Sequence, residues 1–283
     1  MKAVIFSIWQ SGLKIQMYRG GKKMAVLASV HPDNLRSVRG QVSDEEWQTR
    51  VDLAACYRLV DYYDMSDLLG THISARVPGE KNTFLLNPYG MYFDEITASS
   101  LIKVDYDGNV LTETPFDLNK AGFTIHSAVM MGRPDINCAL HTHTRAGIAV
   151  SALKCGLLPM SQHSARFIDN IGYHDYEGVA HDHDERERLQ RDLGDYLSLI
   201  LRNHGLLTCG FNIGHAFWLI YKLERACQAQ IDGMAAGTKV IEIDRGVQES
   251  TKELFAKKKS AGGDLGWPGH LRRLDRMDPS YKN

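Results

Sequence analysis

Three histidines of this sequence have the residue type and spacing of metal ligands. His141 and His143 lie two residues apart in LHTHT, directly after the apolar residues 138–140. On a β-strand, residues i and i+2 project from the same face, so the two imidazoles would lie a few ångströms apart. His204 lies in an Asn-His-Gly sequence between two apolar segments and could supply a third nitrogen. Three neutral imidazoles leave positions open for substrate or water, which is typical of a catalytic metal site.

The same spacing also fits histidines that bind nothing. A histidine pair at the end of a strand is common, and Asn-His-Gly is an ordinary hairpin turn in which Gly205 lets the backbone reverse. The local sequence does not require His204 to converge with the pair. Spacing alone therefore leaves two interpretations open, a divalent metal site and unliganded histidines.

Capping residues and helical periodicity predict the elements that position these histidines. A helix is expected after Ser43, where S-D-E-E forms a capping box ahead of apolar residues at helical spacing. Asn119 is expected to cap a helix that continues to about Met131, and Asn212 a long helix that continues to about Ile231. Shorter helices are predicted at 146–153 and 185–196.

Apolar and alternating segments predict strands between these helices. The predicted strands are 70–77, 83–86, 101–104, 138–143, 197–201 and 206–209. Asp107-Gly108 is a hairpin signal after the third of them. The order of elements predicts an α/β chain whose largely antiparallel sheet lies between helices.

Composition excludes several classes of protein. The chain has 283 residues and a formal net charge of -1, so binding to nucleic acid or an acidic membrane through bulk charge is not expected. Its longest apolar stretches fall far short of the roughly 20 residues of a spanning helix, and its N-terminus is a poor secretory signal. Five scattered cysteines without CxxC spacing suit reduced thiols. We therefore expect a cytoplasmic protein.

Five ordered segments resemble the class II aldolase/adducin family. They are NPYGMYFDEITASSLIKVD (87–105), AGFTIHSAVMMGRPDINCALHTHT (121–144), KCGLLPMSQ (154–162), YHDYEGVA (173–180) and LILRNHGLLTCG (199–210). The resemblance covers about residues 45–236 and is closest to the adducin head domain and its bacterial relatives. The chain is therefore expected to consist of three parts: a flexible N-terminal arm, 1–40, which lacks sustained periodicity, a domain of this family, 41–236, and a polar C-terminal extension, 237–283.

The resemblance implies a fold, a cofactor and an assembly. The fold is a three-layer αβα sandwich around a mostly antiparallel sheet, usually assembled as a homotetramer with its sites at subunit boundaries. In the metal-dependent members three histidines bind zinc, or manganese or iron in some relatives, and they match His141, His143 and His204. We therefore expect a divalent metal, zinc before manganese or iron, a small-molecule substrate and a homo-oligomer.

Three positions depart from the pattern of the family's aldolases. Gly122 stands where the aldolases have their catalytic glutamate, and His72 replaces the asparagine of their phosphate-binding loop, here residues 70–74, without an added basic residue. His163 lies near the position of a tyrosine that the aldolases donate across the subunit interface. These departures predict an unphosphorylated substrate, with His72 or His163 as the proton-transferring residue. Alternatively, His72 hydrogen-bonds within its turn and His163 is a solvated loop residue.

A retained histidine set without the glutamate predicts a metal-dependent lyase. It would be a decarboxylase or aldolase that acts on a hydroxylated carboxylate. The alternatives are a non-haem iron oxygenase and a non-catalytic adducin-like binding or assembly module. Actin or spectrin binding is not expected, because the lysine run 257–259 is too short to stand for adducin's basic tail.

Three further candidates lie near the C-terminus. Arg272, Arg273 and Tyr281 could hold a substrate carboxylate, or could simply pack at a surface or interface.

His126, one helical turn after Gly122, is interpreted as a core residue that forms hydrogen bonds.

Overall fold

The computed structural model describes residues 35–178, 184–256 and 261–283. Most of the N-terminal arm expected for residues 1–40, and the lysine run 257–259, therefore lie outside the described residues. Within the described part, no helix combines the length and the apolar character that crossing a membrane would require.

Seven strands form one sheet in the order β3-β2-β1-β4-β7-β6-β5. The strands are β1 (His72–Arg76), β2 (Thr83–Leu86), β3 (Ile102–Asp105), β4 (Cys138–Thr142), β5 (Gly172–His174), β6 (Ser198–Leu201) and β7 (Gly205–Gly210). Every neighbouring pair is antiparallel except β5 and β6, which are parallel. The expected mostly antiparallel sheet is confirmed.

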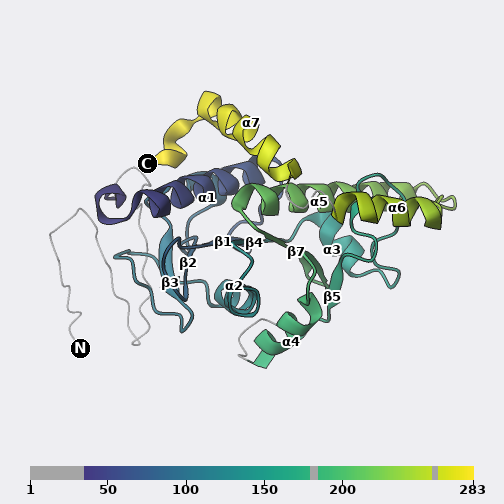
Figure 1. Ribbon diagram of the computed structural model, residues 1–283, viewed down its shortest axis with the longest axis horizontal. Helices are drawn as coiled ribbons and strands as arrows, with labels where there is room; N and C mark the ends of the chain where they lie inside the picture. Colours follow the sequence, from purple (N-terminus) through teal and green to yellow (C-terminus); the bar gives the residue numbers. More distant parts are fainter. Residues whose placement is uncertain (1–34, 179–183, 257–260) are drawn as a thin grey trace, which may run out of the picture.

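Helices cover both faces of this sheet (Figure 1). They are α1 (Asp44–Tyr62), α2 (Lys120–Gly132), α3 (Arg145–Ser151), α4 (Asp184–Leu193), α5 (Ile213–Ala235), α6 (Arg245–Ala256) and α7 (Ala261–Met277). In the view of Figure 1, α1 and α5 lie above the strands, whereas α2 and α4 lie below them. This is the predicted three-layer αβα sandwich.

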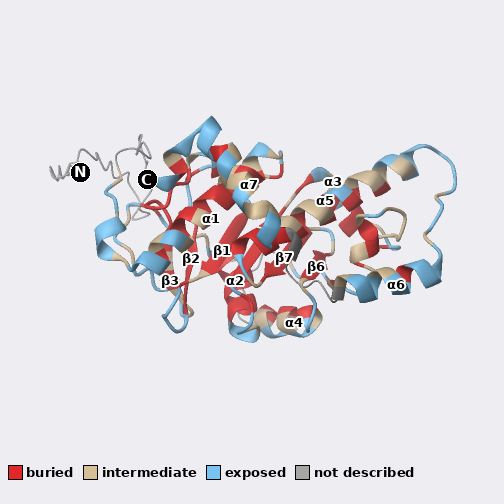
Figure 2. Ribbon diagram, turned by 45° about the horizontal axis from the view of Figure 1, so that its top comes forward, coloured by how far each residue is buried: buried red, intermediate tan, exposed pale blue. Residues whose placement is uncertain are grey.

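The alternation of side chains along β4 divides the interior into two cores. Cys138 and Leu140 pack with α1 and α5, whereas Ala139 packs with α2 and α4. His141 follows two residues after Ala139 and therefore projects toward the α2 layer. Figure 2 shows the buried residues concentrated on the strands and on the inner faces of the helices.

The three predicted helix caps are present. The side chains of Ser43, Asn119 and Asn212 accept hydrogen bonds from backbone N–H groups in the first turns of α1, α2 and α5, respectively. Each cap satisfies a donor that the helix cannot.

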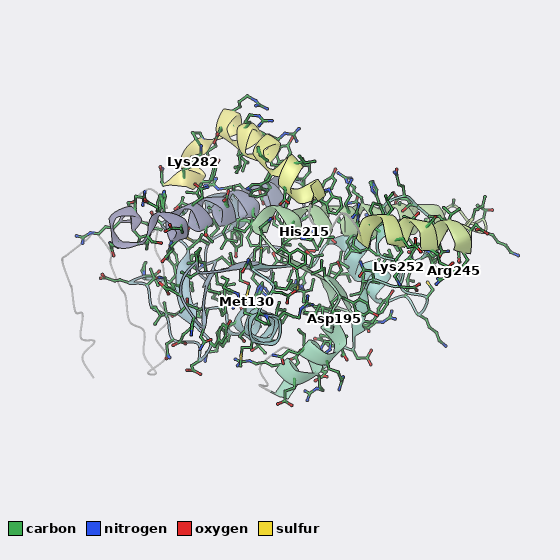
Figure 3. The ribbon with its side chains drawn as sticks, in the orientation of Figure 1. Met130, Asp195, His215, Arg245, Lys252 and Lys282 are labelled. Atoms are coloured by element: carbon green, nitrogen blue, oxygen red, sulfur yellow. The ribbon has the colours of Figure 1, made fainter. Side chains whose placement is uncertain are left out.

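Some elements were not predicted from the sequence. These are the short strand β5 and the helices α6 and α7 of the C-terminal extension. The extension packs against the rest of the chain: Leu274 and Tyr281 are buried in the core that contains α1 and α5. Arg245 and Lys252 lie on α6 (Figure 3). Both approach the Asp169 carboxylate, at 2.7 and 3.8 Å.

Candidate metal centre

The three histidines of the proposed site converge through the pairing of β4 with β7. His141 is the fourth residue of β4, and His143 follows directly after the strand. His204 lies in the turn before β7, and the pairing of Thr142 with Leu206 brings that turn beside the end of β4. The predicted hairpin thus lies next to the predicted histidine pair, which local sequence could not establish.

The turn around His204 differs in detail from the expectation. The left-handed backbone conformation belongs to Asn203, with φ of 55°. Gly205 is required by a close approach instead, because a Cβ atom there would lie 2.3 Å from the carbonyl oxygen of Thr142. Glycine therefore allows β7 to approach the end of β4 closely.

The imidazoles are directed at one another through their Nε2 atoms. His143 Nε2 lies 2.8 Å from His141 Nε2 and 2.8 Å from His204 Nε2. One ring nitrogen from each residue lies within 4.8 Å of the other two, and His141 is completely buried. This is the set of three imidazoles that the sequence analysis expected to act as ligands.

Hydrogen bonds on the outer sides of two rings favour the tautomers that a metal needs. His141 Nδ1 lies 2.9 Å from the carbonyl oxygen of Leu206, which can only accept, so this nitrogen carries the proton. His143 Nδ1 lies 2.9 Å from the Asp67 carboxylate and donates to it in the same way. In the neutral rings the two facing Nε2 atoms then present lone pairs, which repel each other at 2.8 Å unless a cation lies between them. The donor set therefore fits a divalent metal.

Burial keeps the rings of His141 and His204 neutral, which is the form that binds a metal. Burial lowers the pKa of His141 well below its ordinary value, and charge on the neighbouring His72, His204 and His143 would lower it further. Burial also lowers the pKa of His204 to about 4, with a further contribution from His143. Both Nε2 atoms can therefore act as ligands at neutral pH.

His72 lies next to His141, on the side of the sheet that faces α2. It pairs across the sheet with His141, and the two ring centroids are 5.0 Å apart. A Cβ atom on Gly122 would lie 2.5 Å from Cδ2 and 3.0 Å from Nε2 of His72. The imidazole therefore fills the space that a side chain at position 122 would enter. His72 lies on a strand, so the alternative in which it hydrogen-bonds within a turn is wrong.

His126 is buried beneath His72, as the interpretation of a core residue requires. Its Nε2 lies 2.7 Å from His72 Nδ1, and its Nδ1 contacts the hydroxyl of Ser74. All three side chains lie on the α2 face of the sheet and are buried.

His163 lies away from these contacts, at the start of a short 3-10 helix. Burial lowers its pKa, and the cations of Lys222, Arg225 and Arg166 lower it further. Of these cations, Lys222 and Arg225 lie on α5, and Arg166 lies in the same 3-10 helix that follows His163. The neighbours of His163 thus differ from those of His141, His143 and His204. A role of His163 in proton transfer stays a prediction.

The C-terminal candidates also contact other groups. Arg273 Nη1 lies 3.0 Å from the hydroxyl of Tyr63, and Arg272 is exposed. Tyr281 is completely buried and donates a hydrogen bond of 2.8 Å to Asp275. These contacts favour the packing alternative for Tyr281, whereas a substrate contact for any of the three residues stays a prediction.

Two residues that form hydrogen bonds with these histidines could not be predicted from the sequence. Asp67 orients His143, and Ser74 holds His126. An aspartate in a loop and a serine on a strand carry no local signal, because each acts through a residue far away in the chain.

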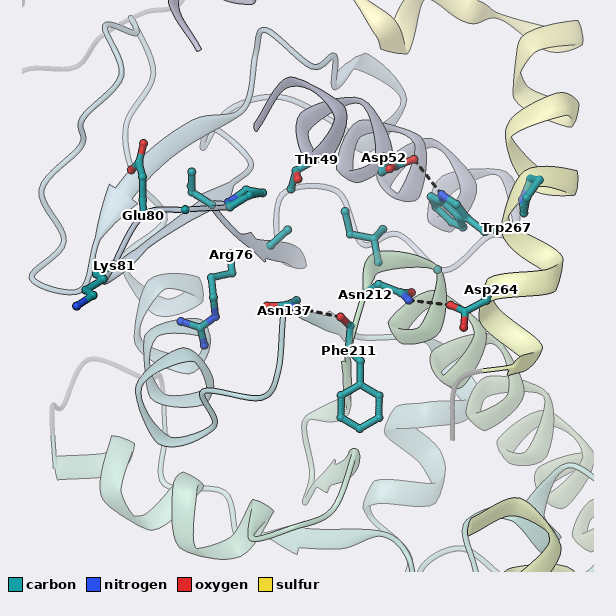
Figure 4. A pocket seen from close by; sticks show the side chains of 17 residues that line it. Thr49, Asp52, Arg76, Glu80, Lys81, Asn137, Phe211, Asn212, Asp264 and Trp267 are labelled. Carbon is teal, nitrogen blue, oxygen red and sulfur yellow. Dashed lines mark hydrogen bonds between the residues drawn. The ribbon is translucent and has the colours of Figure 1, made fainter. Parts of the chain in front are cut away.

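A cavity of about 720 Å³ lies at the opposite end of the same strands (Figure 4). Arg76 at the end of β1, Asn137 before β4 and Phe211 after β7 line it. Trp267 Nε1 on α7 donates a hydrogen bond of 2.9 Å to Asp52 there. Asn137 precedes His141 by four residues in extended chain, so the cavity is roughly 13 Å along β4 from His141.

Comparisons of this chain with known proteins all point to one family. Residues 51–231 match the class II aldolase and adducin N-terminal domain. The crystal structure of an aldolase II superfamily protein from Pseudomonas syringae is 47% identical, covers 88% of this chain and 100% of that chain, and has a TM-score of 0.84. Alpha-adducin of Mus musculus is 45% identical over 190 residues, which are 66% of this chain and 26% of adducin.

A third relative carries a named enzymatic activity. L-fuculose 1-phosphate aldolase from Glaciozyma antarctica is 27% identical, covers 84% of this chain and 93% of that chain, and has a TM-score of 0.76. The fold, the ordered motifs and the extent of these matches agree, and this chain belongs to the class II aldolase and adducin family.

Proposed function

We propose that this protein is a metal-dependent carbon–carbon lyase, a decarboxylase or aldolase, for an unphosphorylated, hydroxylated carboxylate. His141, His143 and His204 would hold the metal, for which zinc is the first candidate and manganese or iron the next. The observation that carries the proposal is the convergence of three imidazole nitrogens within 4.8 Å. A scaffold has no need of this convergence, whereas a catalytic metal site does.

The surroundings of the histidines support a metal site with a fixed geometry. Asp67 and the carbonyl of Leu206 orient two rings from behind, as outer partners of metal-binding histidines do. The chemistry that a bound divalent cation supplies is Lewis-acid stabilisation of negative charge on a substrate oxygen. His72, with its ring 5.0 Å from that of His141 between centroids, is positioned to form a hydrogen bond with an oxygen atom of a substrate held there.

The absence of added positive charge supports an unphosphorylated substrate. Residues 70–74 contain neither lysine nor arginine, although they correspond to the phosphate-binding loop of the aldolases. A phosphate dianion would need donors or cations that this segment lacks. A carboxylate, with its smaller charge, requires less compensation.

Gly122 decides against the glutamate-dependent chemistry of the family's aldolases. With His72 filling the space beside Gly122, no carboxylate is present at this position. We propose that a histidine transfers the proton in this chain, which favours replacement of carbon dioxide by a proton. An aldol cleavage would require His72 to act in place of the glutamate.

Metal content tests the proposal most directly. The full chain, purified without an affinity tag, should contain near-stoichiometric zinc, manganese or iron, and His143→Ala should lose it. His270→Ala on α7, which packs against Phe217, is the matched control and should retain the metal. The loaded protein would then be screened for release of carbon dioxide or an aldehyde from hydroxylated carboxylic acids.

The alternative, a non-catalytic adducin-like module, makes the opposite prediction. Its support is the 45% identity with part of alpha-adducin. A folded protein that contains no metal and refuses added zinc, manganese and iron would overturn the lyase proposal in favour of this module. We further propose a homo-oligomer, with a tetramer as the first expectation, which light scattering on the full chain would measure.

A further inference from the structure

We infer that Ser74 and His126 are positioning residues that hold His72 as the tautomer with a proton on Nε2, so that His72 presents a hydrogen-bond donor to an oxygen atom of the ligand. The part of this inference that concerns the ligand rests on the proposed function. The part that concerns the three side chains rests on their contacts alone.

The three residues form a continuous chain of hydrogen bonds. The Ser74 hydroxyl contacts His126 Nδ1, and His126 Nε2 lies 2.7 Å from His72 Nδ1. Ser74 and His126 have no exposed surface, and His72 is 2% exposed. Both nitrogens of His126 are thus used inside the protein, whereas Nε2 of His72 has no hydrogen-bond partner among the described residues.

Two directions of donation are compatible with neutral rings. In the first, Ser74 donates to His126, and His126 Nε2–H donates to His72 Nδ1, which leaves the proton of His72 on Nε2. In the second, every donor is reversed and His72 Nε2 carries a lone pair. In that case the Ser74 hydroxyl hydrogen lacks an acceptor, because His126 is the partner of Ser74 Oγ among the described residues.

The cost of an unpaired buried donor decides between the two directions. A buried hydroxyl without a hydrogen-bond acceptor is strongly disfavoured, and burial also opposes a charged ring by lowering the pKa of His126 to about 3. The first direction satisfies Ser74, His126 and His72 Nδ1 together. It leaves His72 as a neutral donor at Nε2.

The free nitrogen lies on the side of the ring where a ligand would approach. It is 3.0 Å from the position of a Cβ atom on Gly122, and the His72 ring lies beside that of His141. An N–H at this point would stabilise a carboxylate or phenolate oxygen, and would disfavour a ligand that presents a donor there. The arrangement therefore selects ligands with an acceptor oxygen.

Nitrogen NMR on the full chain, labelled with 15N at histidine, tests the direction of donation. We expect one proton covalently attached to His126 Nε2, with scalar coupling across the hydrogen bond to His72 Nδ1, and a second proton on His72 Nε2. The signals are assigned with His72→Gln. A proton on His72 Nδ1, or a doubly protonated His72, would overturn the inference.

Two variants at position 126 test whether this residue positions His72. His126→Gln can still donate to His72 Nδ1, whereas His126→Met cannot. The 15N resonance of His72 Nδ1 should stay near its wild-type position in the Gln variant and shift to that of an unbonded nitrogen in the Met variant. Ser74→Ala should disturb the His126 Nδ1 resonance in either background. Equal spectra for the Gln and Met variants would overturn the positioning role.

Salicylate, a hydroxylated carboxylate, probes the consequence for binding. In the zinc-loaded protein its affinity, measured by calorimetry, should fall about tenfold in His126→Met and less than about threefold in His126→Gln, since a hydrogen bond to a charged group is involved. Equal losses in both variants would contradict the donor role. Failure of the wild type to bind zinc would overturn the proposed function, whereas the NMR result decides the tautomer without any metal.

Discussion

The strands β1, β4 and β7 have two ends that differ in chemistry. At one end the Nε2 atoms of His141, His143 and His204 are directed at one another. At the other end the same strands border a cavity of about 720 Å³, where Asp52 is already paired with Trp267. The cavity thus lies at the end where these polar groups already have partners, and the three imidazoles converge at the other end.

This difference shows that volume and chemistry are separate criteria for a site. At the cavity end the polar side chains mostly satisfy one another or the backbone: Asn212 binds Asp264, and Asn137 binds the carbonyl of Phe211 (Figure 4). At the histidine end, lone pairs face each other and require a cation. We therefore propose the functional site at the end where the imidazole nitrogens of three histidines face one another.

The largest effect is expected from His141→Ala. This change removes a buried ligand and the donor to the carbonyl of Leu206, so metal binding should be abolished, as measured by elemental analysis. Asn137→Ala, at the other end of β4, is the matched control and should retain the metal. Equal metal contents in the two variants would remove the distinction between the two ends.

A smaller loss is expected from Asp67→Ala. Loss of the partner of His143 Nδ1 frees the ring to rotate, and such outer partners typically contribute 10–100-fold to metal affinity. Competition with a chelator measures this loss. Asp67→Asn keeps an acceptor oxygen and should lose less affinity; an Asn variant as weak as the Ala variant would contradict the orienting role.

Gly122→Ala should destabilise the fold by about 1–3 kcal/mol, because its Cβ would lie 2.5 Å from a His72 ring that His126 holds in place. Urea unfolding measures the change. Gly266→Ala on α7 is the control near the cavity end: its Cβ meets nothing within 4 Å, so the helix should gain up to about 1 kcal/mol. A Gly122→Ala protein as stable as the control would show that His72 is free to move.

The smallest effect is a pH dependence at Asp52. Burial raises the pKa of this carboxyl, although hydrogen bonds from Trp267 and Gln48 lower it. The folded protein then binds the proton more tightly than the unfolded chain, so the stabilisation is complete below the ordinary aspartate pKa of 3.8 and is lost as pH rises through the raised value.

Asp52→Asn keeps an acceptor for Trp267 and removes this titration. The free energy of unfolding of the wild type, minus that of the variant, should therefore fall as pH increases across this window, as urea unfolding at several pH values would show. A difference that increases with pH would contradict the raised pKa. Metal content should stay the same, because Asp52 lies at the cavity end.

Local rules predicted the elements whose causes are local. The caps at Ser43, Asn119 and Asn212 are present because each involves residues three positions apart. The helices α6 and α7 were missed. At the start of α6, Asp244 accepts a hydrogen bond from the Gly246 N–H, a capping signal that the sequence did contain. Tertiary packing also holds α6, because Arg166 lies between Trp218 on α5 and Phe255 on α6.

That His141 and His143 share a face could be predicted locally, because alternation along a strand is a property of the backbone. The approach of His204 could not, since it depends on the pairing of Thr142 with Leu206, which are more than 60 residues apart in the chain. The same holds for the hydrogen bonds that set the tautomers of His143 and His72: His143 donates to Asp67, and Ser74 and His126 form the chain that ends at His72. Register between distant strands arises from packing of the whole sheet, and local sequence carries no record of it.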